Sequence, residues 1–202
     1  MKTIQLIAAL SGLVRAASWQ VSAAKGPSYT YGELGYMHFD ADKYDGNGGR
    51  VNISYGATDL IFVKMGYART FVDGVGVSGI DVDRFNIGIG GHMAITDNAD
   101  VLGVVSYIDH EYSGGIPTEA DEGYQVDLGV RAMVTKKVEL NATAIYRHMA
   151  LTSALGVTDD DDFGAEVGTV IKLKKKFHFT GNVNYLDESE EAGVFAGIRL
   201  YF

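Results

Sequence analysis

The residues best suited to chemistry in this sequence are its histidines and the serines and carboxylates beside them. The histidines are His38, His92, His110, His148 and His178. His110 and His148 fall near the ends of two predicted strands, and Ser106, Asp109 and Ser113 lie close to His110 in the sequence. A histidine that meets a serine and a carboxylate can activate a nucleophile for hydrolysis. Geometry defines such a site, and histidines at a barrel rim are more often ordinary interfacial residues, so we expect no catalytic residues.

Three local motifs match binding signatures only in part. Residues 74–79 satisfy the glycine pattern of a dinucleotide-binding loop, but a strand pattern follows them where a helix is required. His110-Glu111 begins a zinc-protease motif, and Gly114 stands where the second histidine belongs. Residues 40–51 begin like a calcium loop, and Val51 occupies the position of the final glutamate. We therefore predict no cofactor and no metal at these motifs.

A larger set of charged residues lies on the polar side of segments in which apolar and polar residues alternate. The set consists of Glu33, Arg50, Lys64, Arg84, Asp127, Arg131, Glu139, Arg147, Glu166, Lys172 and Arg199. Enclosed charges are tolerated when they are paired and hydrogen-bonded, so one interpretation is a network of ion pairs that fills an interior. The alternative is the selectivity lining of a narrow pore, in which the excess of basic residues predicts a preference for anions.

The segments that carry these charges are predicted to be β-strands. In the last one, Val194, Ile198 and Leu200 share one face and Arg199 lies on the other, which is the two-residue period of a strand. Ten such segments are predicted, at Tyr29–Asp40, Gly49–Ala57, Leu60–Val72, Val82–Ile95, Val101–Ser113, Gly123–Val134, Val138–Ala150, Phe163–Leu173, Phe177–Leu186 and Ala192–Phe202. The connections between them are alternately short and long. We predict an all-β fold, a closed antiparallel up-and-down transmembrane β-barrel of about ten strands.

The alternation alone fits a soluble lipocalin-like barrel equally well, so other features must decide which face meets water. Aromatic residues gather towards strand ends, as two interfacial girdles require. They are Tyr29, Tyr31, Tyr36, Phe71, Phe85, Tyr112, Tyr124, Tyr146, Phe163, Phe177, Tyr201 and Phe202. Glycines and opposite charges on the polar face suit a crowded lumen better than an open surface. We therefore expect the apolar faces to contact lipid.

Acidic runs are predicted in the long connections, at Glu119–Glu122, Asp159–Asp162 and Asp187–Glu191. Solvated loop charge is the ordinary explanation of such runs. A sharper hypothesis is that their carboxylates hold divalent cations that bridge to lipopolysaccharide phosphates, because hard cations prefer clustered oxygen ligands.

The beginning of the chain is typical of an exported protein. Met1 and Lys2 give a positive start, residues 3–14 are apolar, and small residues follow near position 24. We predict a signal peptide at residues 1–24 and one barrel domain at residues 25–202. The chain contains no cysteine, so no disulfide holds the fold. Its net charge of −9 argues against a nucleic-acid partner.

With these features the chain resembles the small outer-membrane β-barrel superfamily of Gram-negative bacteria, which includes porin-like and OmpA-like barrel domains. Its most specific match is the terminal strand, where Gly197, Leu200 and Phe202 occupy the positions that the barrel assembly machinery reads in that family. Phe195 departs from the pattern, because the family usually has a polar residue there. The resemblance implies a location in the cell outer membrane, with lipid, lipopolysaccharide and the assembly machinery as partners.

Three functions fit such a barrel. Eight strands enclose a space that side chains just fill, and ten leave little more room, which favours a packed interior. The sequence therefore predicts a non-catalytic protein with a structural or surface-interaction role in the cell envelope. A narrow porin-like channel for small solutes is the alternative. An outer-membrane hydrolase acting on lipid or peptide through His110 or His148 is the third and least favoured possibility.

Overall fold

The computed structural model describes residues 27–41, 44–74, 77–114, 119–153 and 156–202. They form ten strands: β1 (Tyr31–Ala41), β2 (Tyr44–Gly56), β3 (Ile61–Gly74), β4 (Val77–Thr96), β5 (Ala99–Ser113), β6 (Glu119–Met133), β7 (Val138–Ser153), β8 (Gly156–Lys172), β9 (Phe177–Leu186) and β10 (Glu191–Tyr201). The predicted signal peptide lies outside the described residues. No helix in the described ranges is long and apolar enough to cross a membrane.

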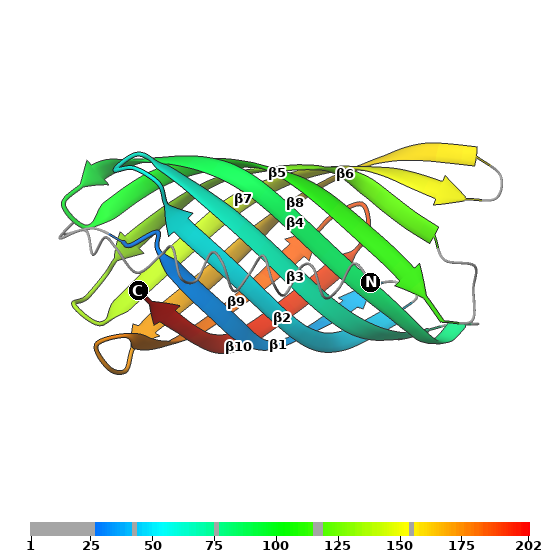
Figure 1. The fold of residues 1–202 in the computed structure, drawn as a ribbon, viewed down its shortest axis with the longest axis horizontal. Coiled ribbons are helices and arrows are strands. Elements are labelled where there is room, and N and C mark those ends of the chain that lie inside the picture. The colour runs from blue at the N-terminus through cyan, green and yellow to red at the C-terminus, as the bar shows by residue number, and fades with distance from the viewer. Residues whose placement is uncertain (1–26, 42–43, 75–76, 115–118, 154–155) are drawn as a thin grey trace.

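The strands close into a single barrel in which each strand is antiparallel to its neighbours in the chain (Figure 1). The seam is the pairing of β1 with β10, where Glu33 lies opposite Arg199 and Gly35 lies opposite Gly197. This closure confirms the predicted all-β, up-and-down architecture of ten strands. A closed sheet leaves no strand edge unpaired, which a β-structure in lipid requires.

Both ends of the barrel wall lie on one side, because β1 begins there and β10 ends there (Figure 1). We call this the terminal side and the opposite one the hairpin side. Turns on the terminal side are short and locally determined. Thr58 and Thr135 each accept backbone hydrogen bonds at their hydroxyls, from the N–H groups of Ile61 and Val138 at 3.0 Å. Such side-chain bonds to the backbone stabilise a tight turn.

The connections on the hairpin side are shorter than the sequence predicts, because strands continue into them. The run Asp159–Asp162, predicted as loop, lies in β8, and Glu119–Glu122 lies in β6. In register, Asp162 faces Arg147 and Asp161 faces His148. Opposite charges across neighbouring strands stabilise the ladder, so the extended hairpin forms despite its acidic composition. The yellow hairpin of β7 and β8 projects beyond the rest of the barrel in Figure 1.

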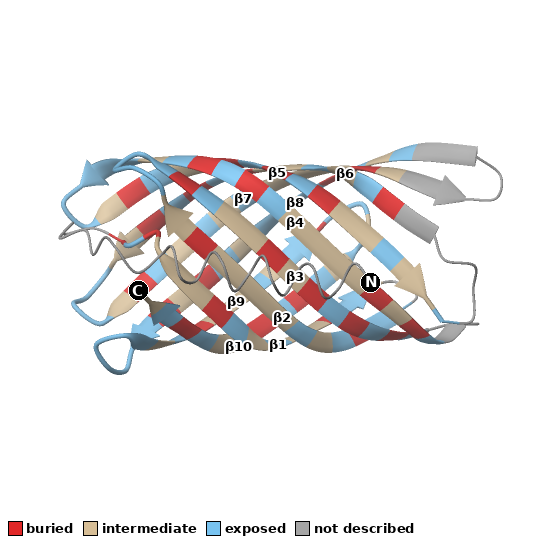
Figure 2. Cartoon of the chain, viewed as in Figure 1, coloured by how far each residue is buried: buried red, intermediate tan, exposed pale blue. Residues whose placement is uncertain are grey.

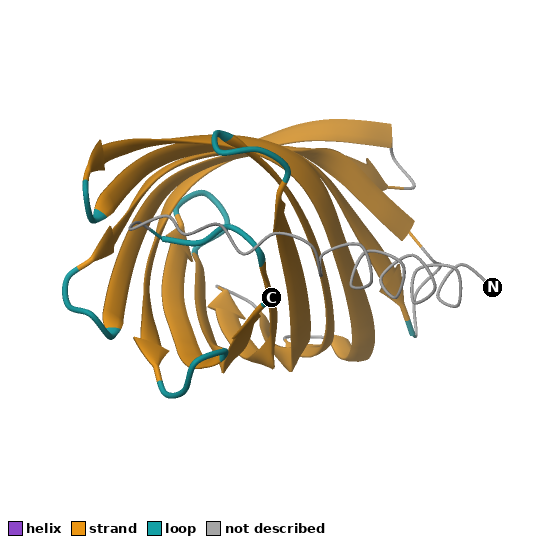
Figure 3. Cartoon of the chain, turned by 60° about the vertical axis from the view of Figure 1, so that its left-hand side comes forward, coloured by secondary structure: helices purple, strands orange, loops and turns teal. Residues whose placement is uncertain are grey.

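The two faces of the wall differ in chemistry, and exposure alternates along each strand (Figure 2). Leu34 and Leu128 point outward and are each 64% exposed, whereas Arg131 and Arg199 on the other face are each 6% exposed. Figure 3 shows the strands curving around a common interior. Contiguous apolar surface of this extent is unusual on a soluble monomer and is what a lipid-facing band requires.

The aromatic residues divide between the two faces, which corrects part of the predicted girdles. Tyr29, Tyr31 and Tyr201 near the terminal side face the interior, where they contact arginines. A belt of outward aromatic rings is present towards the hairpin side, formed by Tyr36, Tyr107, Tyr124, Phe163 and Tyr185. The alternation of a strand decides these directions, and proximity to a strand end does not.

Candidate functional site

The candidate site is the interior of the barrel, which holds a cavity of about 330 Å³. Every strand from β1 to β10 contributes to its lining. The cavity reaches Tyr29 and Arg131 towards the terminal side and His110 and Arg147 towards the hairpin side. A cavity of this volume with a polar lining accommodates on the order of ten water molecules, at about 30 Å³ each. The barrel is therefore partly hollow, although many of its inward side chains pack against one another.

Most of the charged residues predicted to face the interior line this cavity. They are Glu33, Arg50, Lys64, Arg84, Asp127, Arg131, Arg147, Glu166 and Arg199. Glu139 is 3% exposed and sits behind the lining, where it contacts Arg131. Lys172 is exposed near the terminal end of β8, opposite His178, and does not line the cavity.

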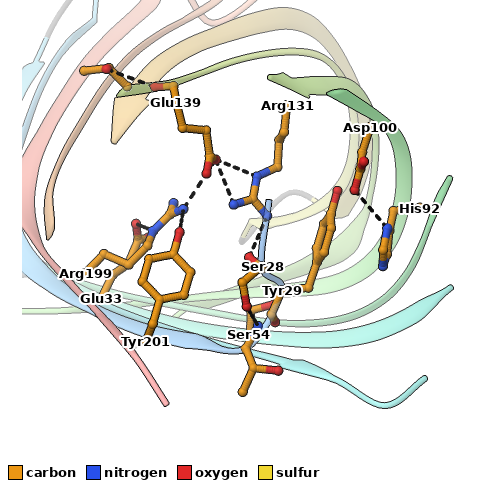
Figure 4. A network of polar contacts seen from close by, with 12 residues as sticks. Ser28, Tyr29, Glu33, Ser54, His92, Asp100, Arg131, Glu139, Arg199 and Tyr201 are labelled. Carbon is orange, nitrogen blue, oxygen red and sulfur yellow. Dashed lines mark hydrogen bonds and ion pairs between the residues drawn. The ribbon is translucent and has the colours of Figure 1, made fainter. Parts of the chain in front are cut away.

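A continuous polar network crosses the lumen near the terminal side (Figure 4). Glu139 on β7 accepts a hydrogen bond from Arg131 Nε on β6 at 2.7 Å. Arg199 on β10 lies 3.6 Å from the same carboxylate and donates to Glu33 on β1 at 2.8 Å. The Arg199 guanidinium also donates to the Tyr201 hydroxyl at 3.1 Å. This arrangement satisfies two buried cations with two buried carboxylates, as a low-dielectric interior requires.

Further ion pairs lie across the middle and the hairpin side of the lumen. Lys64 on β3 reaches Asp127 on β6 at 2.6 Å, although two strands separate them in the wall. Arg147 pairs with Asp162 at 3.1 Å, and Ser189 also donates to that carboxylate. One pair joins neighbouring strands and the other joins strands three positions apart, so together they fix the separation of several strands of the wall.

Arg84 is tied to both an acid and an aromatic ring. Its guanidinium lies 3.3 Å from Glu191 and 4.3 Å from the centre of the Phe39 ring. Phe39 packs with Val72, Ile80 and other apolar side chains into a cluster inside the hairpin half of the lumen. The cluster narrows that half of the lumen.

Arg50 and Glu166 differ from the other mid-lumen charges, because within the described ranges neither makes an ion pair. The Arg50 guanidinium instead stacks over the Phe195 ring at 3.8 Å. Gly35 and Gly197 leave the space that this ring occupies, since a Cβ on either would lie 2.7 or 2.8 Å from a ring carbon. Phe195, which stands where the resemblance described above predicts a polar residue, thus supplies the ring on which Arg50 stacks.

Several interior acids were not predicted, and they change the charge balance. Asp100, Asp162 and Glu191 face inward, where they pair with His92, Arg147 and Arg84. The two-residue period of the strand predicts that Asp162 faces inward, because Asp162, Gly164 and Glu166 lie on the same face. The predicted end of the strand at Phe163 excluded it. With these acids included, the lumen no longer carries the basic excess from which a preference for anions was predicted.

The histidines considered for catalysis lie on opposite faces of the wall. His110 lines the cavity, whereas His148 lies on the outer face and contacts Asp161 at 2.8 Å. Hydrogen bonds from His148 and Tyr146 hold the pKa of the Asp161 carboxyl below its ordinary value. Ser106 is four residues from His110 along β5, a separation of roughly 13 Å. Neither histidine is therefore part of a nucleophile–base pair with the residues that the sequence suggested.

The acidic runs do not form a metal centre in the part of the chain that the structure describes. There, no group of three or more histidine, aspartate and glutamate side chains is arranged to hold a metal ion. Asp162 points inward to Arg147, and Asp161 points outward to His148. Alternation along β8 separates neighbouring carboxylates, so the run does not act as one cluster.

Comparison with known proteins places the fold. No protein-family model matches the sequence, and no curated protein matches it. The outer-membrane channel COG4313 from Pseudomonas putida F1 has a TM-score of 0.57 at 11% identity, over 92% of this chain and 98% of the channel. The NanC porin has a TM-score of 0.52 at 8% identity, covering 85% and 100%. The β-domain of the Bordetella autotransporter BrkA has a TM-score of 0.52 at 10% identity, covering 86% and 99%.

These likenesses define the class of protein. The chain is a closed β-barrel with a polar interior, similar in fold to outer-membrane channels and porins. Identities this low show the fold alone. The location, the solute and any partner must be argued from the wall and the interior of this barrel.

Proposed function

We propose that the protein is a narrow, non-catalytic channel for small hydrophilic solutes in the outer membrane. The observation that supports this function best is the cavity of about 330 Å³, which reaches from Tyr29 to Arg147 and is lined by charged and polar side chains. A barrel that served only as a scaffold would gain stability by filling this space with apolar groups. A hydrated path with paired charges suits small solutes and excludes large ones.

The selectivity of this channel is weak in the proposal, because most interior charges are compensated. An ion pair presents little net field to a passing solute. Arg50 and Glu166 interact electrostatically with each other but make no direct ion pair in the described structure, and both line the cavity. We therefore assign to these two residues the main influence on which ions pass.

Single-channel recording in planar bilayers tests the proposal. Purified protein is expected to give small, discrete current steps that grow with salt concentration. Arg50→Glu is expected to shift the reversal potential in a salt gradient towards cations. Lys174→Glu, in the exposed turn between β8 and β9, is the matched control and is expected to leave the reversal potential unchanged. Silent bilayers with verified folded protein, both for the wild type and for the Tyr29 variants proposed below, would refute the channel.

The second candidate is a structural or surface-interaction role in the envelope. The interior networks favour it, because they cross-link strands that are not neighbours in the wall and so stiffen the barrel. It predicts folded, membrane-inserted protein without current steps, so the same recording separates the two functions. Membrane lipid and lipopolysaccharide are the partners in either case, and the assembly machinery is proposed to act through Gly197, Leu200 and Phe202.

A further inference from the structure

The four residues before β1 enter the barrel instead of continuing its wall. β1 begins its ladder at Tyr31, which faces Ser54 on β2 and Tyr201 on β10. Two of the four residues before β1, Pro27 and Tyr29, are buried, and Tyr29 is only 5% exposed. Tyr29 also lines the central cavity. The segment therefore occupies the terminal mouth of the lumen.

Backbone contacts fix this segment to two distant parts of the wall. The Ser54 hydroxyl on β2 donates to the Tyr29 carbonyl oxygen at 2.7 Å. The Arg131 guanidinium on β6 donates to the Ser28 carbonyl oxygen at 3.2 Å. Because three strands separate β2 from β6 in the wall, these bonds hold the segment across the opening (Figure 4).

The Tyr29 ring fills the space between these anchors. It stacks on His92 at 3.8 Å between centroids and meets the Phe62 ring at 4.7 Å. The Arg131 guanidinium covers it from the other direction at 4.6 Å. His92 is held in turn by Asp100, and Val104 completes the apolar cluster around the ring. Aromatic stacking and a cation over the ring each favour this position over an exposed one.

The ring and the polar network together form one layer across the lumen. Arg131 belongs to both, since it covers Tyr29 and pairs with Glu139. Glu139 continues the layer to Arg199 and Glu33 at the seam of the barrel. We propose that residues 27–30 form a plug that closes the terminal mouth of the lumen, with the Tyr29 side chain as its stopper. With this plug in place, the polar centre of the barrel is closed at that end.

The consequence for conduction rests on the proposed channel function, whereas the closure itself does not. Two measurements therefore separate them. The first is the reactivity of a cysteine placed behind the stopper. Gln125 suits this purpose, because it lies opposite Ser106 on β6, lines the cavity and is only half-buried. The sequence has no native cysteine, so Gln125→Cys carries the only thiol.

Thiol modification by a charged, membrane-impermeant reagent is compared in three backgrounds: Gln125→Cys alone, with Tyr29→Ala and with Tyr29→Phe. Tyr29→Phe is the matched control, because it keeps the ring and removes only the hydroxyl, which lies beside the Asp100 carboxylate. Heat-modifiable migration in gels verifies folding of each variant. Tyr29→Ala is expected to raise the modification rate severalfold, and Tyr29→Phe to leave it unchanged, since reactivity follows access to the thiol.

Single-channel recording of the same Tyr29 variants is the second measurement. Tyr29→Ala is expected to increase the conductance or the open fraction severalfold, with Tyr29→Phe like the wild type. Ser54→Ala, which removes one anchor and keeps the ring, is expected to give an intermediate open fraction and serves if Tyr29→Ala does not fold. An unchanged thiol rate in folded Tyr29→Ala would overturn the plug, whatever the currents. A raised thiol rate with no current in any variant would support the plug and refute the channel.

Discussion

Neutralising Glu139 is the perturbation whose cost follows most directly from the lumen network. Glu139 is 3% exposed and is the only carboxylate paired with Arg131 in the described structure. Arg199 would keep Glu33 at 2.8 Å after Glu139→Gln, whereas Arg131 would keep no carboxylate. Removing one partner of a buried ion pair costs about 3–5 kcal/mol of folding free energy. Because Glu139→Gln leaves one buried cation, Arg131, without a carboxylate, we expect a loss of about 3 kcal/mol. That loss lowers the folding equilibrium constant roughly a hundredfold.

The companion variants show whether the cost comes from the uncompensated charge. Adding Arg131→Met to Glu139→Gln removes the orphaned cation, so the double variant is expected to be more stable than Glu139→Gln alone. Glu188→Gln is the control, because its carboxylate is exposed in the turn between β9 and β10. It is expected to change stability by less than about 0.5 kcal/mol.

Urea unfolding of the barrel refolded into lipid vesicles measures these free energies of unfolding. Heat-modifiable gel migration reports the folded fraction at each urea concentration. A cost for Glu139→Gln below about 1 kcal/mol would contradict a buried, charge-dependent network. So would a double variant whose loss equals the sum of the single losses, because strict additivity means that the two residues do not interact.

Three further changes test other parts of the structure. Gly48→Val is expected to prevent folding, because a Cβ at this inward position would collide with the Arg69 carbonyl oxygen. Gly49→Val is the control and is expected to fold normally in the same refolding assay, because its Cβ would point outward and meet a single atom, at 4.0 Å. Deletion of Phe202 is expected to reduce the heat-modifiable fraction in outer-membrane preparations, and wild-type levels would rule out its role in assembly. Asp161 has a lowered pKa in the folded barrel, so its contribution to stability is complete above its ordinary value of 3.8 and lost as the pH falls through the lower folded value. Asp161→Asn should therefore lose less stability on acidification than the wild type. Identical acid-unfolding profiles of the two proteins would exclude this contribution of Asp161.

The sequence predicts the wall of this barrel well, because each strand has a two-residue period with one apolar face. Residues 124–130 of β6 show why: Tyr124, Val126 and Leu128 alternate with Gln125 and Asp127. The same period assigns the inward charges, since each lies one residue away from an outward apolar residue. Register adds contacts that the sequence leaves open, such as Glu33 opposite Arg199 at the seam.

The two ends of the barrel are less predictable, because contacts between distant segments decide them. The aspartates at 159–162 suggest a loop until their partners on β7 are known. The two-residue period puts Tyr29 on the inward face, but contacts with His92, Phe62 and Arg131 decide where its ring lies in the lumen. No local sequence pattern can predict that the Tyr29 ring contacts residues 33 to 102 positions away in the chain. The plug therefore emerges only from the closed barrel.

The central claim is that the apolar face of the wall meets lipid while the charged face encloses a hydrated lumen. Nitroxide labels at single cysteines along β6, in protein reconstituted into lipid vesicles, test it most directly. Labels at Leu128→Cys and Val130→Cys are expected to collide mainly with oxygen dissolved in lipid, and a label at Gln125→Cys mainly with a water-soluble nickel chelate. The reverse pattern, with the chelate reaching 128 and 130 and oxygen favouring 125, would contradict the account.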